Sequence, residues 1–137
     1  MAQTQTWTNT GITELVQLLY AGTGATKLMS IVGLTDTTAC TAAVTSTYAS
    51  PADAKCTDTG LEIANITTIA VATANTAGDS VDFDHVFTAS GTKNVSGIIV
   101  CNDDDDVAFI ECCFNAVLAM ENTDTLTIDG RATIDQA

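Results

Sequence analysis

The candidates for acid–base chemistry begin with His85, the only histidine of the chain. It shares one face of an alternating run with Val81, Phe83 and Phe87, whereas Asp82 and Asp84 fall on the other face. A catalytic histidine needs a nucleophile to activate or a carboxylate to orient it. Successive side chains of a strand point to opposite faces, so neither aspartate shares the face of the imidazole. We therefore interpret His85 as a packed or edge histidine.

A run of aspartates, Asp103 to Asp106, is the second group with possible chemistry, because carboxylate oxygens bind calcium. Calcium loops with a strong signal alternate their ligands and bend around a glycine, and this run does neither. We interpret it as the solvated tip of a hairpin, whose charge also discourages edge pairing. Weak calcium binding is the alternative, and no metal ligand is assigned.

Five cysteines are the candidates for thiol chemistry: Cys40, Cys56, Cys101, Cys112 and Cys113. None forms a C-x-x-C pair, and an odd number argues against a fully paired disulfide framework. Cys112 and Cys113 are adjacent on an expected strand, so they point to opposite faces and do not serve one site. We expect small buried thiols in a reduced compartment. The alternative is a Cys40–Cys56 disulfide formed after release into an oxidising exterior.

The usual catalytic motifs are absent from the sequence. It holds no P-loop, nucleophile elbow, zinc-protease motif or dinucleotide fingerprint. The residues after Gly22-Thr23-Gly24 do not complete a phosphate-binding motif. We therefore expect a protein that is not an enzyme, with no catalytic residue and no cofactor.

The charge of the chain limits its partners. Four lysines and arginines face 17 acidic residues, which gives a net charge of −13. Such a chain cannot form the basic stripe that neutralises phosphates, so nucleic acid and anionic membranes are not expected partners. The charge suits a self-repelling soluble surface, a basic partner surface or a high-salt habitat. With neither a secretory signal nor an apolar run of about 20 residues, we expect synthesis in a cytoplasm.

The N-terminal part is expected to hold an arm and the only helix. Residues 1–11 are rich in Thr and Gln and predict an extended arm or a first edge strand. Apolar residues then recur at helical spacing from Ile12 to Ala21, before Gly22 ends the run. At 137 residues with 46% hydrophobic composition, the rest of the chain suits one domain over residues 12–137.

Trp7, the only tryptophan, lies in this polar N-terminal segment. Because tryptophan buries a large apolar area, one interpretation is that it folds back as an anchor of the core. The other is that the arm adds a strand to a neighbouring subunit and inserts the ring there. Trp7 is therefore our one candidate partner-binding residue.

The rest of the chain predicts strands joined by turns. Leu28 to Gly33 and Ile66 to Thr73 are short β-branched runs, and Asp36 to Thr59 between them predicts a long loop that can hold a short strand. Ala77 to Asp79 predicts a turn, and Val81 to Phe87 alternates with a period of two.

The segment from Ser96 to Gly130 predicts a β-meander. Gly97 to Cys101 and Val107 to Phe114 flank the acidic tip, and Thr125 to Gly130 follows a turn at Glu121 to Asp124. Six or seven short strands at this spacing indicate a mainly β fold, an antiparallel β-sandwich or barrel with one short N-terminal helix.

Four stretches of the chain, taken in order after the short helix and glycine turn, carry a family resemblance: Phe83 to Gly91, Val95 to Val100, Ile110 to Phe114 and Asp124 to Ile128. Together they resemble the small structural proteins of tailed viruses such as bacteriophages, over Gly11 to Asp129. This resemblance implies a β-rich virion component that is oligomeric and often trimeric. Members include capsid decoration or cement proteins and tail or fibre proteins.

The resemblance implies a non-enzymatic structural protein located in the virion and made in the host cytoplasm. The favoured expectation is a decoration protein that bridges neighbouring major capsid proteins on the outer shell and forms a homo-oligomer, with a trimer as one option. A tail or fibre-associated protein is the alternative. A calcium- or carbohydrate-binding β-sandwich is a third class, which an aromatic content of only 5% disfavours.

Overall fold

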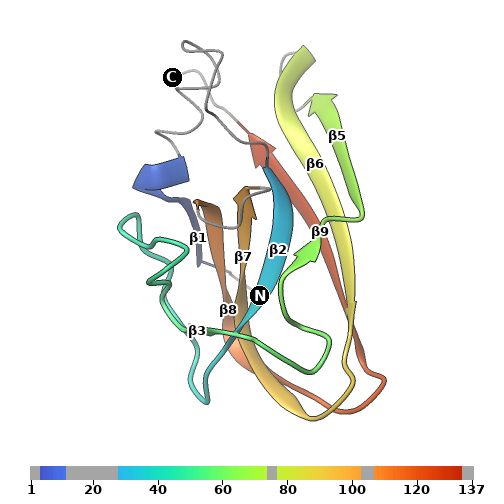
Figure 1. Cartoon of the computed structure of the whole chain (residues 1–137). Helices are drawn as coiled ribbons and strands as arrows, with labels where there is room; N and C mark the ends of the chain where they lie inside the picture. The colour runs from blue at the N-terminus through green and yellow to red at the C-terminus, as the bar shows by residue number, and fades with distance from the viewer. Residues whose placement is uncertain (1–3, 12–27, 74–76, 103–106, 134–137) are drawn as a thin grey trace.

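The computed structural model describes residues 4–11, 28–73, 77–102 and 107–133 (Figure 1). Strands dominate this part of the chain, as the alternating and β-branched runs predict. In chain order they are β1 (Thr4–Trp7), β2 (Leu28–Thr35), β3 (Ala54–Lys55), β4 (Ala64–Asn65), β5 (Thr68–Thr73), β6 (Ala77–Thr88), β7 (Lys93–Asn102), β8 (Ala108–Met120) and β9 (Thr125–Thr133).

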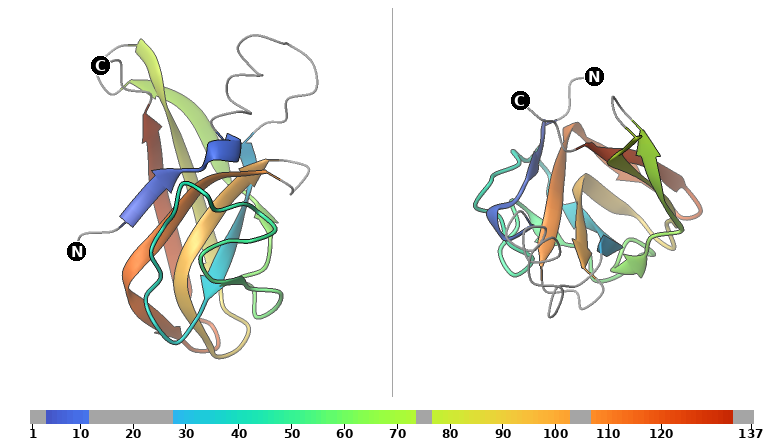
Figure 2. Two further views of the ribbon diagram at one scale, coloured as in Figure 1. Left: turned by 90° about the vertical axis from the view of Figure 1, so that its left-hand side faces the viewer. Right: turned by 90° about the horizontal axis from the view of Figure 1, so that it is seen from above.

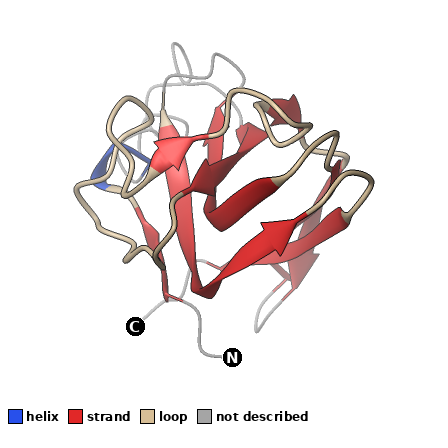
Figure 3. Ribbon diagram, turned by 90° about the horizontal axis from the view of Figure 1, so that it is seen from below, coloured by secondary structure: helices blue, strands red, loops and turns tan. Residues whose placement is uncertain are grey.

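The strands form two antiparallel sheets that pack face to face (Figure 2, right). The large sheet has the order β1-β8-β7-β2-β3, with β4 also paired to β2, and the small sheet has the order β5-β6-β9. The prediction of a mainly β, antiparallel sandwich is therefore confirmed. The helix expected over Ile12 to Ala21 lies outside the described residues, and one helical turn at residues 9–11 follows β1 (Figure 3).

The core between the sheets comes from the alternating faces of their strands. On β6, Phe83 and Phe87 are buried, while Asp84 and Val86 are exposed. The two phenylalanines pack with inward side chains of β7 and β8, including Ile98. Burying a side chain of this size stabilises the fold by about 1.5–3 kcal/mol, so the alternation in the sequence fixes which face of each strand points inward.

The outer face of the large sheet is covered as well. A second cluster of buried side chains lies there, formed by Val32, Leu34, Ile99, Cys101 and Ala108, with Cys40, Tyr48 and Ile63 packed against them. The cover is the segment between β2 and β3, residues 36–53, which crosses β7 and β8 (Figure 2, left). Consequently β7 is buried on both faces from Val95 to Asn102, as its continuous apolar run indicates.

Two boundaries differ from the predictions. Ala77 begins β6, where a turn at Ala77 to Asp79 was expected, because Thr73 pairs with Ala77 and closes the hairpin earlier. Strand β8 continues past Phe114 to Met120 through an irregularity opposite Ser96. The expected turn after it is present: Asp124 accepts from the Glu121 amide at 2.8 Å through its carboxylate.

The N-terminal segment belongs to the large sheet. Strand β1 pairs antiparallel with β8, with Trp7 opposite Ile110, and forms one edge. Beyond β1 the Thr8 amide donates to the Phe109 carbonyl at 3.0 Å, and the Asn9 amide donates to the Val44 carbonyl at 2.8 Å. This segment therefore also contacts the loop that covers the outer face.

Candidate functional site

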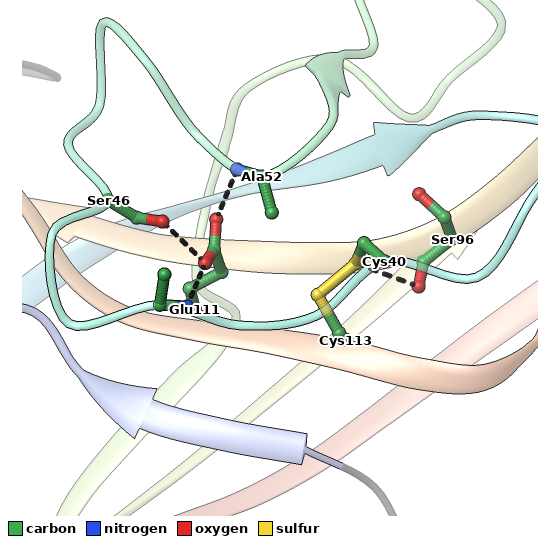
Figure 4. The surroundings of a disulfide bond; sticks show 7 residues. Cys40, Ser46, Ala52, Ser96, Glu111 and Cys113 are labelled. Carbon is green, nitrogen blue, oxygen red and sulfur yellow. Dashed lines mark hydrogen bonds between the residues drawn. A yellow bond between two sulfur atoms is a disulfide. The ribbon is translucent and has the colours of Figure 1, made fainter.

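A disulfide between Cys40 and Cys113 attaches the covering segment to β8 (Figure 4). Their Cα atoms are 5.4 Å apart, although 73 residues separate them in the sequence. The expectation that these two cysteines are reduced thiols is wrong, and so is the alternative Cys40–Cys56 bridge. Cys56 instead lies in the core between the sheets, 3% exposed. Spacing along the chain carries no information on such a long-range pairing.

The remaining cysteines, Cys56, Cys101 and Cys112, are buried and form no disulfide. Cys112 lies in the core between the sheets, whereas its neighbour Cys113 points to the other face of the large sheet, beneath the covering segment. The adjacent pair therefore serves no common site, as predicted. Burial raises the pKa of Cys56 to about 11 and also raises the pKa of Cys112. Since the thiolate is the nucleophile, these two thiols are unsuited to covalent chemistry at neutral pH.

Glu111 provides a second attachment of the covering segment, two residues before Cys113. Its side chain is fully buried and accepts three hydrogen bonds from that segment. The Ala43 amide at 3.0 Å and the Ser46 hydroxyl at 2.7 Å donate to Oε2, and the Ala52 amide at 2.7 Å donates to Oε1 (Figure 4). Buried carboxylates are stable only when their oxygens are bonded in this way.

We call residues 36–53 the locked loop, because a covalent bond and a buried carboxylate both hold it on the sheet. Cys40 Sγ also lies 3.5 Å from the Ser96 carbonyl oxygen. A disulfide sulfur has no hydrogen to donate, so we treat this as a packing contact. The sequence analysis missed Glu111. The one available signal was a charged residue inside the apolar run from Val107 to Phe114.

The surface of the locked loop is partly apolar and carries the exposed carboxylate of Asp36. Val44 is 50% exposed, which makes it one of the most exposed large hydrophobic residues of the described chain. At the end of the loop, the ammonium of Lys55 lies 3.8 Å from the centre of the Tyr48 ring and donates to the Tyr48 carbonyl. Because the disulfide and Glu111 hold the loop in place, it forms a surface of fixed shape that suits contact with another protein.

His85 is packed, as its place between two phenylalanines predicts. It is 7% exposed, its ring meets Phe87 edge to face at 4.4 Å, and Nδ1 lies 3.2 Å from the Thr67 hydroxyl. Burial lowers its pKa from the usual value. On the opposite face of β6, Asp82 pairs with Arg131 of β9, so this carboxylate does not orient the imidazole.

Two sequence candidates fall outside the described side chains. The backbone of Trp7 lies in β1, and its side chain is not described. Asp103 to Asp106 lie wholly outside the described residues, so weak calcium binding stays a prediction. In the described part of the chain, no group of three or more His, Cys, Asp or Glu side chains could hold a metal ion.

A cavity of about 410 Å³ opens between the two sheets at one side of the sandwich. Apolar side chains of the large sheet line one wall, among them Ile98, Ile110 and Phe114. The other wall is the unbroken stretch 127–133 of β9. The cavity therefore lies beside the β9 edge of the small sheet.

Comparisons with protein-family models, with curated proteins and with solved structures found no match. Within the described ranges, no helix has the length and apolar character needed to cross a membrane. The features that bear on function are therefore the locked loop, the edge strands and the charge of the chain.

Proposed function

We propose that the protein is a non-enzymatic structural protein of a virion, a decoration protein that binds neighbouring capsid subunits on the outer shell. The observation that carries the proposal is the locked loop, which Cys113 and Glu111 hold on the outer face of the large sheet. A loop fixed in this way is built to present a constant surface to a partner.

The energetic advantage of such a loop is its order before binding. Association costs roughly 0.5–1.5 kcal/mol for each side chain that it immobilises, and the ordering of a flexible loop adds to this. Here the loop is already held by a disulfide and by three hydrogen bonds to Glu111. Its exposed Val44 can therefore dock without that cost of ordering the backbone.

The disulfide favours an external location. Disulfides persist on virion and cell surfaces and are rare in a reducing cytoplasm. A protein made in the host cytoplasm would close the Cys40–Cys113 bond after the particle reaches an oxidising exterior. The outer surface of a shell meets this condition.

The net charge of −13 favours the outer side of a shell over its interior. A strongly acidic protein is repelled by packaged nucleic acid, whereas an acidic exterior keeps particles soluble. The partner patch on the capsid should accordingly be neutral or basic.

The test is binding of the purified protein to capsid shells that lack it. Two hydrophobic residues, Val44 on the locked loop and Val86 on the small sheet, are each 50% exposed, so they form a matched pair. We expect Val44→Asp to weaken shell binding by about tenfold or more, and Val86→Asp to leave it unchanged. If the wild-type protein labels the tail and leaves the shells bare, the tail-associated alternative replaces the decoration role. Binding to neither refutes the proposal.

A further inference from the structure

Strand β9 forms an edge of the small sheet in the described part of the chain. It pairs with β6 along nine residues and, among the described residues, with no other strand. Its residues 127–133 line the cavity without interruption, so side chains of both faces and the backbone between them border the opening. Exposed edge strands are templates for pairing, and proteins usually protect them with short length, proline, β-bulges or charged side chains, lysine above all. The nine residues of β9 contain neither proline nor lysine.

The charges on this edge have an unusual arrangement. Arg131 pairs with Asp82 of β6, through Nε at 2.5 Å and Nη2 at 2.8 Å. Two residues earlier, Asp129 lies directly opposite Asp84, another carboxylate. Like charges in this position repel each other. Asp129 makes no hydrogen bond or ion pair within the described part of the chain, so a cation from outside would relieve the repulsion.

We propose that β9 pairs antiparallel with β9 of a second copy of this chain, about a twofold axis at Gly130. In this register Asp129 lies opposite Arg131 of the partner subunit, and the symmetry repeats the pair. Asp129 and Arg131 are two residues apart on one strand, so their side chains point to the same face of the sheet. Gly130 between them faces inward. The two small sheets become one continuous sheet across an isologous interface.

The inner face of β9 fits the same register. Ile128 and Ala132 line the cavity. In this register Ile128 would lie opposite Ala132 of the partner subunit, and the symmetry repeats this pair. The second copy therefore brings two further apolar side chains to the mouth of the cavity. The net charge of −13 on each chain opposes this association, so screening by salt should strengthen the dimer. The inference does not depend on the proposed virion role.

Sedimentation of the full-length chain at about 0.15 M salt tests the interface. We expect a reversible dimer. Asp129→Arg places two arginines opposite each other across the axis and should weaken the dimer by about tenfold or more, although it relieves the repulsion by Asp84. Asp84→Arg makes the same change in charge on the central strand β6 and should change the dimer constant by less than about threefold. The swap Asp129→Arg with Arg131→Asp should restore the dimer.

Crosslinking tests the register. Thr127 should lie opposite Thr133 of the partner subunit, whereas within one chain the two are six residues apart, about 20 Å along the strand. We expect the double variant Thr127→Cys, Thr133→Cys to form a disulfide-linked dimer on oxidation, and each single variant to form far less. A wild-type protein that stays monomeric up to about 1 mM would overturn the proposal. So would a swap variant that is no better than Asp129→Arg, or single variants that crosslink as well as the double variant.

Discussion

Glu111 and Cys113 lie two residues apart on β8, point to the same face and hold the same loop. One does so by hydrogen bonds from a buried carboxylate and the other by a covalent bond. Their side chains share a face because a strand repeats every two residues. The loop of residues 36–53 is therefore fixed at both of its halves, and the outer face of β7 is buried.

Removal of the disulfide should cost about 4 kcal/mol of unfolding free energy, because the bond closes a loop of 73 residues in the unfolded chain. We expect the double variant Cys40→Ala, Cys113→Ala to show this loss in denaturant unfolding. A reductant should lower the stability of the wild-type protein and leave that of the variant unchanged. Equal sensitivity of the two proteins to reductant would contradict the assigned bond.

Replacement of Glu111 by alanine should destabilise the fold by about 3 kcal/mol, because three donors, one of them the buried Ser46 hydroxyl, lose their acceptor. Glu111→Gln keeps one acceptor oxygen and should fall between alanine and wild type. Glu62 is exposed and serves as the control, for which Glu62→Ala should change stability by less than about 0.5 kcal/mol. Equal effects at the two glutamates, measured by thermal and denaturant unfolding, would rule out this role of Glu111.

The sheets could be predicted from the sequence because their signals are local. Burial on one face produces the alternation from Val81 to Phe87. Burial on two faces produces the continuous apolar run from Gly97 to Cys101. The sequence of Asp36 to Thr59 correctly predicted a loop. Its position over the large sheet depends on contacts with Glu111 and Cys113, which are distant in the chain, and no local pattern encodes them.

Gly130 should not tolerate a side chain. A Cβ at this position would lie 2.2 Å from Cζ of Phe83, the residue directly opposite on β6. We expect Gly130→Ala to cost about 2 kcal/mol, and less when Phe83→Leu removes the ring, as a double-mutant cycle would measure. Gly91→Ala is the control, because its new methyl group would meet only the Thr59 side chain, at 3.3 Å. Additive effects of the two core changes would refute the contact.

Protonation of His85 should destabilise the fold. Its pKa is lowered by burial in the folded state, so the folded protein binds this proton less readily than the unfolded chain. The stability contributed by the neutral ring is complete above the unfolded pKa of about 6.5, and it is lost as the pH falls through the lower folded value. Because the chain has one histidine, NMR titration of the imidazole gives the folded pKa directly. A midpoint at or above about 6.5 would contradict this account.

The candidate site was less predictable than the fold. Cysteine types and numbers were visible, but the pairing of Cys40 with Cys113 follows from where the loop lies. Glu111 appeared as one charge in an apolar strand, and its meaning depends on three donors from another segment. The exposed edge of β9 follows from the sheet order, which strand patterns alone leave open.

The central claim is that this domain is a structural component on the outer shell of a virion. Its most direct test is electron microscopy of native particles, with the position of the domain identified in the map. The account predicts density for the sandwich on the outer surface, where capsid subunits adjoin, with the locked loop of residues 36–53 facing the shell. Particles that lack the protein, or that carry it only inside the shell, would contradict the account.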